Sequence, residues 1–276
     1  MILITGATGT IGSEVTRLLA EAGVPATAMT RDPGKVAGPA VRGDFGDVRS
    51  LEAAVTGVST ALLLTAFGAE LAAHERAFVD VAARAGVRKV VKISVLGAPD
   101  SDDPEDTGGL HAAGERALTG SGMAWTILRP SMFATNALGW AAAVRAGQPI
   151  PNVTGRGRLG VIDPRDIAAV AVAALTGSAH DGRAYDLTGP DLLSTHDQAE
   201  LIGRAIGRRV ETVDVPIEQA LAQVPDPVYA RAAAKGWAAI AADTSAILTT
   251  TVQDVLGRPA GSFESWAREN KAAFGG

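Results

Sequence analysis

Short apolar runs alternate with longer amphipathic stretches through the first half of the chain. Gly, Pro or polar residues bound these runs, as is typical of buried strands. The predicted strands occupy residues 2–5, 25–30, 60–65, 89–94 and 125–128, with a short one near 40–42. Helical patterns separate them at residues 10–22, 50–55, 71–85 and 110–120. This alternation predicts an α/β fold with a Rossmann-type doubly wound parallel sheet.

The second half of the chain has a less regular pattern. Helices are expected at 138–145, at 163–175 with Asp163 as N-cap, and at 195–206, where Gly207 ends the helix. Strands are expected at 158–162, 184–187 and 210–215, followed by a mostly helical stretch over 217–242. We therefore expect a Rossmann core over residues 1–150. A smaller α+β C-terminal substrate lobe over residues 151–276 is interleaved with that core.

Composition and charge exclude several classes of function. The chain has 276 residues, 47% of them hydrophobic, which is enough for a sizeable core. Its net charge of −5 and the lack of a Lys/Arg-rich run argue against a nucleic-acid partner. It has no cysteine, and its four histidines form no ligand pair, so no metal site is expected. The longest apolar stretch, 167–175, is half a membrane span, and no targeting segment is visible, so a cytoplasmic protein is expected.

The strongest chemical signal is a Gly-x-x-Gly-x-x-Gly turn between the first strand and the first helix. Gly6 allows the tight turn, Gly9 lets a pyrophosphate approach the backbone, and Gly12 lets the helix pack on the strand. The N–H groups at the start of the helix then face the phosphates. The predicted dinucleotide contacts of this turn are Gly6, Thr8, Gly9, Thr10, Ile11 and Gly12.

The end of the second predicted strand indicates NADP(H) rather than NAD(H). NAD-specific sites usually place an acidic residue here, to bind the ribose hydroxyls. This chain instead has Arg31, whose guanidinium can hold a 2′-phosphate, and Lys35 can assist. Asp32 follows Arg31, and Pro33 is expected to turn its carboxylate away. The alternative is a solvated loop arginine.

Further cofactor contacts are expected at the carboxyl ends of the next strands, the edge where ligands bind to doubly wound sheets. Asp44 and Phe45 can border the adenine, or be a loop carboxylate and a packing ring. The segment Thr65, Ala66 and Phe67 is expected to line the ribose or nicotinamide. Ser94 is expected to contact the substrate or nicotinamide, the alternative being a serine that only satisfies the backbone.

Taken together, these segments resemble the NmrA-like atypical short-chain dehydrogenase/reductases, and in particular the type 2 NAD(P)H:quinone oxidoreductases. The resemblance rests on the glycine turn and on residues 30–33, 91–94 and 125–130, and it continues through 163–168 and 263–266. It implies that the segment after the sixth strand contacts nicotinamide and substrate. Pro130, Ser131 and Phe133 are the cofactor contacts expected there.

The wider superfamily usually uses a Tyr-x-x-x-Lys pair as its acid–base, and this chain lacks it. Neither Tyr185 nor Tyr229 has a lysine four residues later. The equivalent helix has His111 at the Tyr position and Glu115 at the Lys position. Because residues i and i+4 share a helix face, Glu115 is expected to orient His111 and raise its pKa, making it a proton donor. The alternatives are a helix-surface ion pair and a packing histidine.

The substrate side of the site is less specific. Met132, Phe133, Asn136 and Trp140 fall at near-helical spacing and, with His111, are the expected contacts of a flat ring. Core packing between the lobes explains the four as well. The acidic segment 100–106 is either a flap beside the pocket or a solvated loop.

The leading functional hypothesis is an NADPH-dependent oxidoreductase that transfers hydride to a quinone or related conjugated carbonyl. One alternative is a tailoring reductase of a polyketide-like or aromatic metabolite. Another is a non-catalytic NADP(H)-binding redox sensor that regulates a partner. The expected partner is a small flat aromatic or quinone-like molecule, with neither nucleic acid nor membrane, and the chain is expected to be a monomer or a homodimer.

Overall fold

A computed structural model describes residues 1–98, 103 and 107–276 of the chain, so the acidic segment 100–106 lies, except for Asp103, outside the described residues. The chain forms two compact units, each built from two segments. The first unit comprises Met1–Arg129 and Ile167–Asp186, and the second comprises Pro130–Asp166 and Leu187–Gly276.

The first unit is built on a seven-stranded sheet with the order β3-β2-β1-β4-β5-β6-β9. The strands are β1 (Ile2–Ile4), β2 (Ala26–Thr30), β3 (Ala40–Arg42), β4 (Thr60–Leu63), β5 (Lys89–Ile93), β6 (Ala124–Pro130) and β9 (Arg183–Leu187). The pairs from β3 through β6 are parallel. The order reverses between β1 and β4, which is the place where doubly wound sheets bind ligands. The predicted Rossmann-type fold is confirmed.

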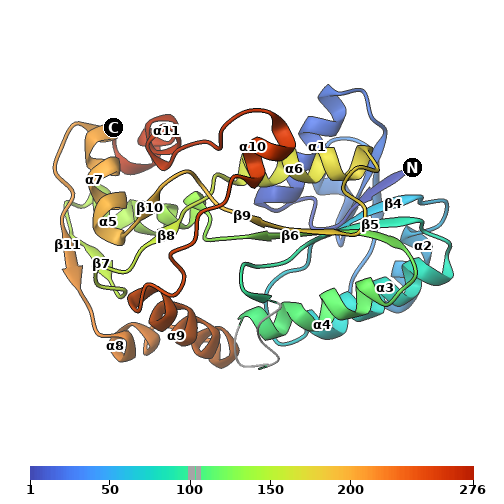
Figure 1. Cartoon of the computed structure of the whole chain (residues 1–276), viewed down its shortest axis with the longest axis horizontal. Coiled ribbons are helices and arrows are strands. Elements are labelled where there is room, and N and C mark those ends of the chain that lie inside the picture. Colours follow the sequence, from blue (N-terminus) through green and yellow to red (C-terminus); the bar gives the residue numbers. More distant parts are fainter. Residues whose placement is uncertain (99–102, 104–106) are drawn as a thin grey trace. The chain divides into compact units, whose positions relative to one another are not determined.

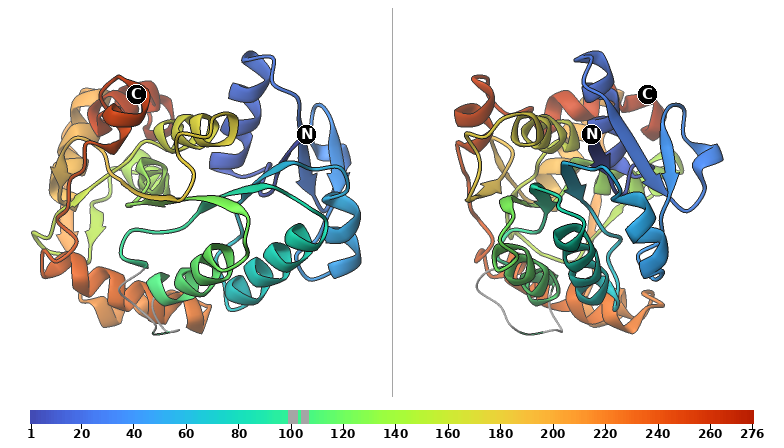
Figure 2. Two further views of the ribbon diagram at one scale, coloured as in Figure 1. Left: turned by 45° about the vertical axis from the view of Figure 1, so that its right-hand side comes forward. Right: turned by 90° about the vertical axis from the view of Figure 1, so that its right-hand side faces the viewer.

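Helices cover both faces of this sheet (Figures 1 and 2). On one face lie α1 (Thr10–Glu21) and α6 (Pro164–Thr176), and on the other lie α2 (Val48–Ala54), α3 (Leu71–Arg84) and α4 (Thr107–Thr119). A short 3₁₀ helix, η1 (Pro33–Lys35), follows β2. Leu3, Leu63 and Val90 of the strands pack with Phe78 of α3 in a fully buried cluster. This cluster fixes α3 against the sheet, and thereby positions the polar residues that α3 carries.

The second unit contains two small sheets and several helices. Strand β8 (Leu159–Gly160) pairs antiparallel with β10 (Leu192–Leu193), and β7 (Ile150–Asn152) pairs parallel with β11 (Thr212–Asp214). The helices are η3 (Ala134–Trp140), α5 (Ala141–Arg145), α7 (Thr195–Ile206), α8 (Ile217–Leu221), α9 (Pro227–Ala241), α10 (Thr251–Leu256), α11 (Phe263–Glu269) and η4 (Lys271–Phe274). Phe263, Trp266 and Phe274 form the aromatic part of this unit's core.

The two units divide the chain differently from the expected boundary at residue 150. The first segment of the sheet unit ends at Arg129, and residues 167–186 return to it. The return has a structural reason, because most of α6 covers the sheet and β9 adds its last strand. Within the ranges that the structure describes, no helix is both long enough and apolar enough to cross a bilayer.

Candidate active site

The glycine turn has the geometry that a pyrophosphate site requires. Gly6 has a φ of +60°, which favours glycine, and a Cβ at Gly12 would lie 2.2 Å from the Gly6 carbonyl oxygen. Gly9 is the N-cap of α1, and no side chain caps the helix there. A Cβ at Gly9 would meet only the Gly6 oxygen, at 3.4 Å. The backbone N–H groups at the start of α1 therefore remain open to an anion, and the turn fits a dinucleotide. Thr8 and Thr10 are exposed there, whereas Ile11 is buried.

Two adjacent charged residues follow β2, and they differ in their partners. Asp32 caps η1 by accepting a hydrogen bond from the Gly34 N–H at 3.2 Å, and its other oxygen lies 3.3 Å from Lys35 Nζ. Arg31 is exposed and has no hydrogen bond or ion pair with any described residue. The carboxylate is thus occupied in its own turn, and the guanidinium of Arg31 is available for a 2′-phosphate.

The next two predicted cofactor contacts have local partners. The Asp44 carboxylate accepts a hydrogen bond from the Gly46 N–H at 3.0 Å. The Phe45 ring stacks on His74 with ring centroids 5.8 Å apart, and it also contacts Phe78. Both residues are half-buried. These contacts are the ones expected if Asp44 is a loop carboxylate and Phe45 is a packing ring.

A buried polar network lies at the carboxyl ends of β4 and β5. Lys92 of β5 and Glu75 of α3 are both fully buried, with Lys92 Nζ 2.6 Å from Glu75 Oε1. Thr65, just beyond β4, donates its hydroxyl to the same oxygen at 2.9 Å, while Ala66 beside it is exposed and Phe67 is half-buried. Burial favours the neutral form of Glu75, yet His111 and Lys92 hold the pKa of Glu75 below its ordinary value. Glu75 is therefore an anion in the interior of the first unit.

His111 of α4 faces this ion pair. Its Nδ1 lies 3.3 Å from Lys92 Nζ and 3.8 Å from Glu75 Oε1, and its side chain is 12% exposed. Burial and the ammonium of Lys92 lower the pKa of His111, and the nearby Glu75 only partly opposes them. At neutral pH the imidazole is consequently uncharged. The expectation that the pKa of His111 is raised is wrong.

Glu115 is part of a different network, contrary to expectation. Its Oε1 accepts hydrogen bonds from Ser94 Oγ at 2.5 Å and from Arg129 Nε at 3.0 Å, and its Oε2 accepts from Arg129 Nη2 at 2.6 Å. The helical spacing to His111 is correct, but β5 and β6 bring Ser94 and Arg129 closer. Ser94 is buried, and its proton is already directed at Glu115. The predicted pairing of Glu115 with His111 is therefore wrong.

Sequence reasoning missed Lys92 and Glu75. The signal for Lys92 was a lysine inside an otherwise apolar predicted strand, which a fully buried strand tolerates only with a partner. The signal for Glu75 was weaker and lay on the neighbouring helix. A Cβ at Gly114 of α4 would lie 1.8 Å from Glu75 Oε2, so only a glycine leaves room for the carboxylate there.

The predicted substrate contacts, and the cofactor contacts beside them, lie at the start of the second unit. Ser131 donates its N–H to Leu187 O at 2.9 Å and its hydroxyl to Gly160 O. Met132 and Trp140 pack against that unit's core, and Asn136 is exposed. Residues 134–140 form a 3₁₀ helix, in which a spacing of four does not place side chains on one face. The half-buried Phe133 forms a parallel bridge with Ile162, and Pro130 is buried at the end of β6.

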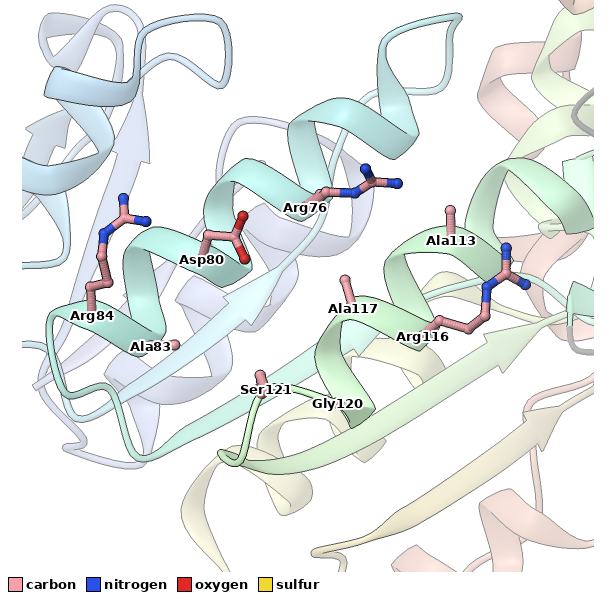
Figure 3. A pocket seen from close by; sticks show the side chains of 9 residues that line it. All are labelled: Arg76, Asp80, Ala83, Arg84, Ala113, Arg116, Ala117, Gly120 and Ser121. Carbon is pink, nitrogen blue, oxygen red and sulfur yellow. The ribbon is translucent and has the colours of Figure 1, made fainter.

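A surface pocket of the first unit lies between the outer faces of α3 and α4 (Figure 3). Arg76 and Arg116 line it from opposite helices, with Asp80 on the α3 side. Glu75 and His111 are not among its lining residues. The pocket is therefore distinct from the buried network. In the part of the chain that the structure describes, no cluster of His, Asp and Glu side chains is arranged to hold a metal ion.

The glycine turn and the sheet order define a Rossmann-type dinucleotide-binding protein. A family model described as NAD(P)H-binding matches residues 6–178, and this chain belongs to that family. An NAD(P)H azoreductase of Xenophilus azovorans is 38% identical, covering 100% of this chain and 99% of its own. A (4-alkanoyl-5-oxo-2,5-dihydrofuran-3-yl)methyl phosphate reductase of Streptomyces griseus is 36% identical, covering 99% of each chain.

Among solved structures, an NADPH-dependent quinone oxidoreductase of Escherichia coli in complex with NADPH is similar, with a TM-score of 0.86. It is 25% identical and covers 98% of this chain and 99% of its own. The NmrA-like resemblance seen in the sequence is confirmed. This chain is an NAD(P)H-dependent oxidoreductase.

Proposed function

We propose that this protein is an NADPH-dependent reductase of quinones or similar conjugated acceptors. The observation that carries the proposal is the buried place of His111 beside Lys92 and Glu75, on the helix where the family resemblance implies the superfamily's tyrosine. The imidazole is uncharged at neutral pH and is held against Lys92 and Glu75. A neutral imidazole is a weak acid, so this site suits acceptors that are reduced with little help from a general acid.

The residues of the chain bind and orient rather than perform covalent chemistry. The glycine turn supports the pyrophosphate, and Arg31 supports the 2′-phosphate. NADPH, when bound, supplies a hydride. Ser94 donates its hydroxyl to Glu115, and Glu115 is paired with Arg129, so neither is available as a proton donor in this arrangement. An acceptor that stabilises the incoming negative charge over its own conjugated system needs the least from such a site.

The activities for which the relatives are named support this class of acceptor. An azo group, a quinone and an oxo-dihydrofuran all carry conjugated double bonds next to electronegative atoms. The relative from Streptomyces griseus also favours a second candidate, a tailoring reductase acting on a conjugated carbonyl of a small metabolite. The two candidates share the cofactor site and differ in the acceptor.

The test is NADPH oxidation by the purified protein with three acceptors: menadione, an azo dye and an alkanoyl-dihydrofuranone phosphate. We expect menadione to be reduced. Turnover of the dihydrofuranone phosphate with no turnover of menadione would support the tailoring reductase instead. NADPH binding by fluorescence, measured in parallel, completes the test. Tight binding without turnover of any acceptor would contradict both candidates and indicate a redox sensor.

A further inference from the structure

We propose that Lys92 and Glu75 are positioning residues that hold His111 neutral, with its single proton on Nε2, so that the imidazole offers an N–H donor to the acceptor. Only the statement that the imidazole donates to the acceptor rests on the proposed function. The state of the histidine itself is a property of the protein without cofactor or acceptor.

The geometry fixes which nitrogen carries the proton. A protonated lysine has three donors and no acceptor, so in the hydrogen bond between Lys92 Nζ and His111 Nδ1, 3.3 Å long, a charged Lys92 donates and the ring nitrogen accepts. The proton of the neutral ring therefore resides on Nε2. The two ring nitrogens point their hydrogen-bonding directions away from each other, and the His111 side chain retains 12% exposure. Burial lowers the pKa of Lys92, and Glu75, whose Oε1 lies 2.6 Å from Nζ, opposes this effect and favours the charged lysine.

The charges around His111 come from three elements. Lys92 of β5 disfavours an imidazolium, whereas Glu75 of α3 favours one. Glu115, one helical turn further along α4, also favours it, but this carboxylate is paired with Arg129. Burial of the ring is the largest of the effects that lower the pKa of His111, and the charge of Lys92 adds to it. Glu75 opposes both effects and also pairs with Lys92, so the two side chains together set the remaining balance.

A neutral donor has a defined consequence for the reaction. The acceptor gains one hydride from the nicotinamide and then one proton from water, and His111 keeps its own proton throughout. The Nε2–H hydrogen bond strengthens as negative charge develops on the acceptor's oxygen or nitrogen. Because the imidazole is not consumed as an acid, turnover does not require its reprotonation.

The first experiment is ¹⁵N NMR titration of the histidine rings in the free protein. The chain has four histidines, and a His111→Gln variant identifies the signals of His111. In the wild type we expect a single tautomer with the proton on Nε2 and titration below the ordinary pKa. A proton on Nδ1, or an imidazolium at neutral pH, would overturn the proposal whichever acceptor the enzyme uses.

Variants of the pair are expected to shift the titration in opposite directions. Lys92→Met leaves Glu75 alone beside the ring and raises the pKa of His111, whereas Glu75→Gln removes the carboxylate that favours the imidazolium and lowers this pKa further. The double variant Lys92→Met/Glu75→Gln has no buried charge and should show both tautomers, so it serves if a single variant does not fold. A wild-type titration in all of these variants would contradict the inference.

Lys89→Met is the matched control. Lys89 begins the same strand and is also buried, but it pairs with Asp181 and donates to Gly177 O. The Lys89→Met variant should leave the titration of His111 unchanged. With menadione, Lys92→Met should lower kcat about two- to tenfold, the range of one ordinary hydrogen bond, while the KM for NADPH stays constant. If the wild type does not reduce menadione, this result would count against the proposed function. It would not count against the proposed tautomer of His111.

Discussion

The pairing of Lys92 with Glu75 is an unfavourable way to stabilise a protein core. Both side chains are fully removed from water, and the attraction between them has to offset the loss of two hydration shells. Apolar residues of similar size commonly replace such pairs at no loss of stability. Glu75 Oε2 is also buried with no hydrogen-bond partner among the described residues. At the scale of the residue, these costs favour a role in the chemistry of the site.

At this same scale, we propose that Arg31 sets the preference for NADPH over NADH. Its guanidinium has no partner among the described residues, so it is available to bind a 2′-phosphate without first breaking a contact within the protein. Arg31→Ala should weaken NADPH binding by about 1.5–3 kcal/mol, the range for hydrogen bonds to charged groups, and leave NADH binding nearly unchanged. Isothermal titration calorimetry with both cofactors measures the difference. Lys35→Ala is the control and should have a smaller effect, since Lys35 already pairs with Asp32; equal losses for NADPH and NADH in Arg31→Ala would remove this assignment.

His111 makes stability depend on pH in a defined direction. Its pKa in the folded protein lies below the ordinary 6.5, so the unfolded chain binds the extra proton first as the pH falls. The contribution is fully present above about pH 6.5 and is lost as the pH falls through the folded pKa. We expect the Tm of the wild type to fall on acidification through this window, and His111→Gln to fall less.

The wild type has to be compared with His111→Gln because burial also lowers the pKa of His180. The contribution of Glu75, whose pKa is lowered as well, belongs to a separate window below its ordinary value of 4.5. Identical pH dependence of Tm in wild type and His111→Gln would show that His111 is not held neutral.

At the scale of the element, the turn from β1 to α1 separates binding from folding. Gly9 has an extended backbone with a φ of −88° and open space around it, whereas Gly12 touches the backbone of the turn. Adding a side chain should therefore have different results at the two positions. A side chain at Gly9 should affect ligand binding, and a side chain at Gly12 should affect stability.

Gly9→Val should abolish dinucleotide binding and leave the Tm nearly unchanged, because its side chain occupies the space of the pyrophosphate. Gly12→Ala should lower the free energy of unfolding by about 1–3 kcal/mol or more, as overpacking does. Thermal denaturation and NADPH fluorescence measure the two effects. Normal NADPH affinity in a folded Gly9→Val protein would contradict the site assigned to this turn.

At the scale of the whole molecule, the chain passes between its two units three times. The second unit must therefore join two segments that are distant in sequence. Asp166, which is buried in the first segment, accepts a hydrogen bond from the Gly261 N–H and pairs with Arg258 Nη1, both at 2.7 Å. The sequence 163–166, first noticed as a helix start, thus also anchors the C-terminal part of the chain.

Asp166→Ala should destabilise the protein by about 1–3 kcal/mol, because the Gly261 N–H loses its acceptor. The loss of the Arg258 pair adds little, since that side chain is half exposed. Urea denaturation measures the change. Glu200→Ala removes an exposed pair with Arg204 and should change stability by less than about 0.5 kcal/mol. Equal effects of the two substitutions would show that Asp166 does not anchor the tail.

Local patterns determined the elements of the first unit and much of α7. Each depends on contacts a few residues apart: the glycine turn into α1, and for α7 the Ser194–Asp197 capping box and the left-handed Gly207. The residues 138–145, predicted as one helix, begin instead in a 3₁₀ helix that ends at Trp140. Their apolar spacing cannot distinguish the two helix types, since that depends on how the segment packs.

The sequence by itself determined the dinucleotide turn, the presence of an arginine after β2 and the absence of the Tyr–Lys pair, because each is read from neighbouring residues. Only the tertiary structure decided the partners of the polar side chains. Glu115 is four residues from His111 yet bonds to Ser94 and Arg129, and His111 instead meets Lys92 and Glu75. The physical reason is that buried charges pair with whichever opposite charge the packing of strands against helices brings nearest. The packing of β5, β6, α3 and α4 sets these distances, and the spacing of residues along one helix cannot predict them.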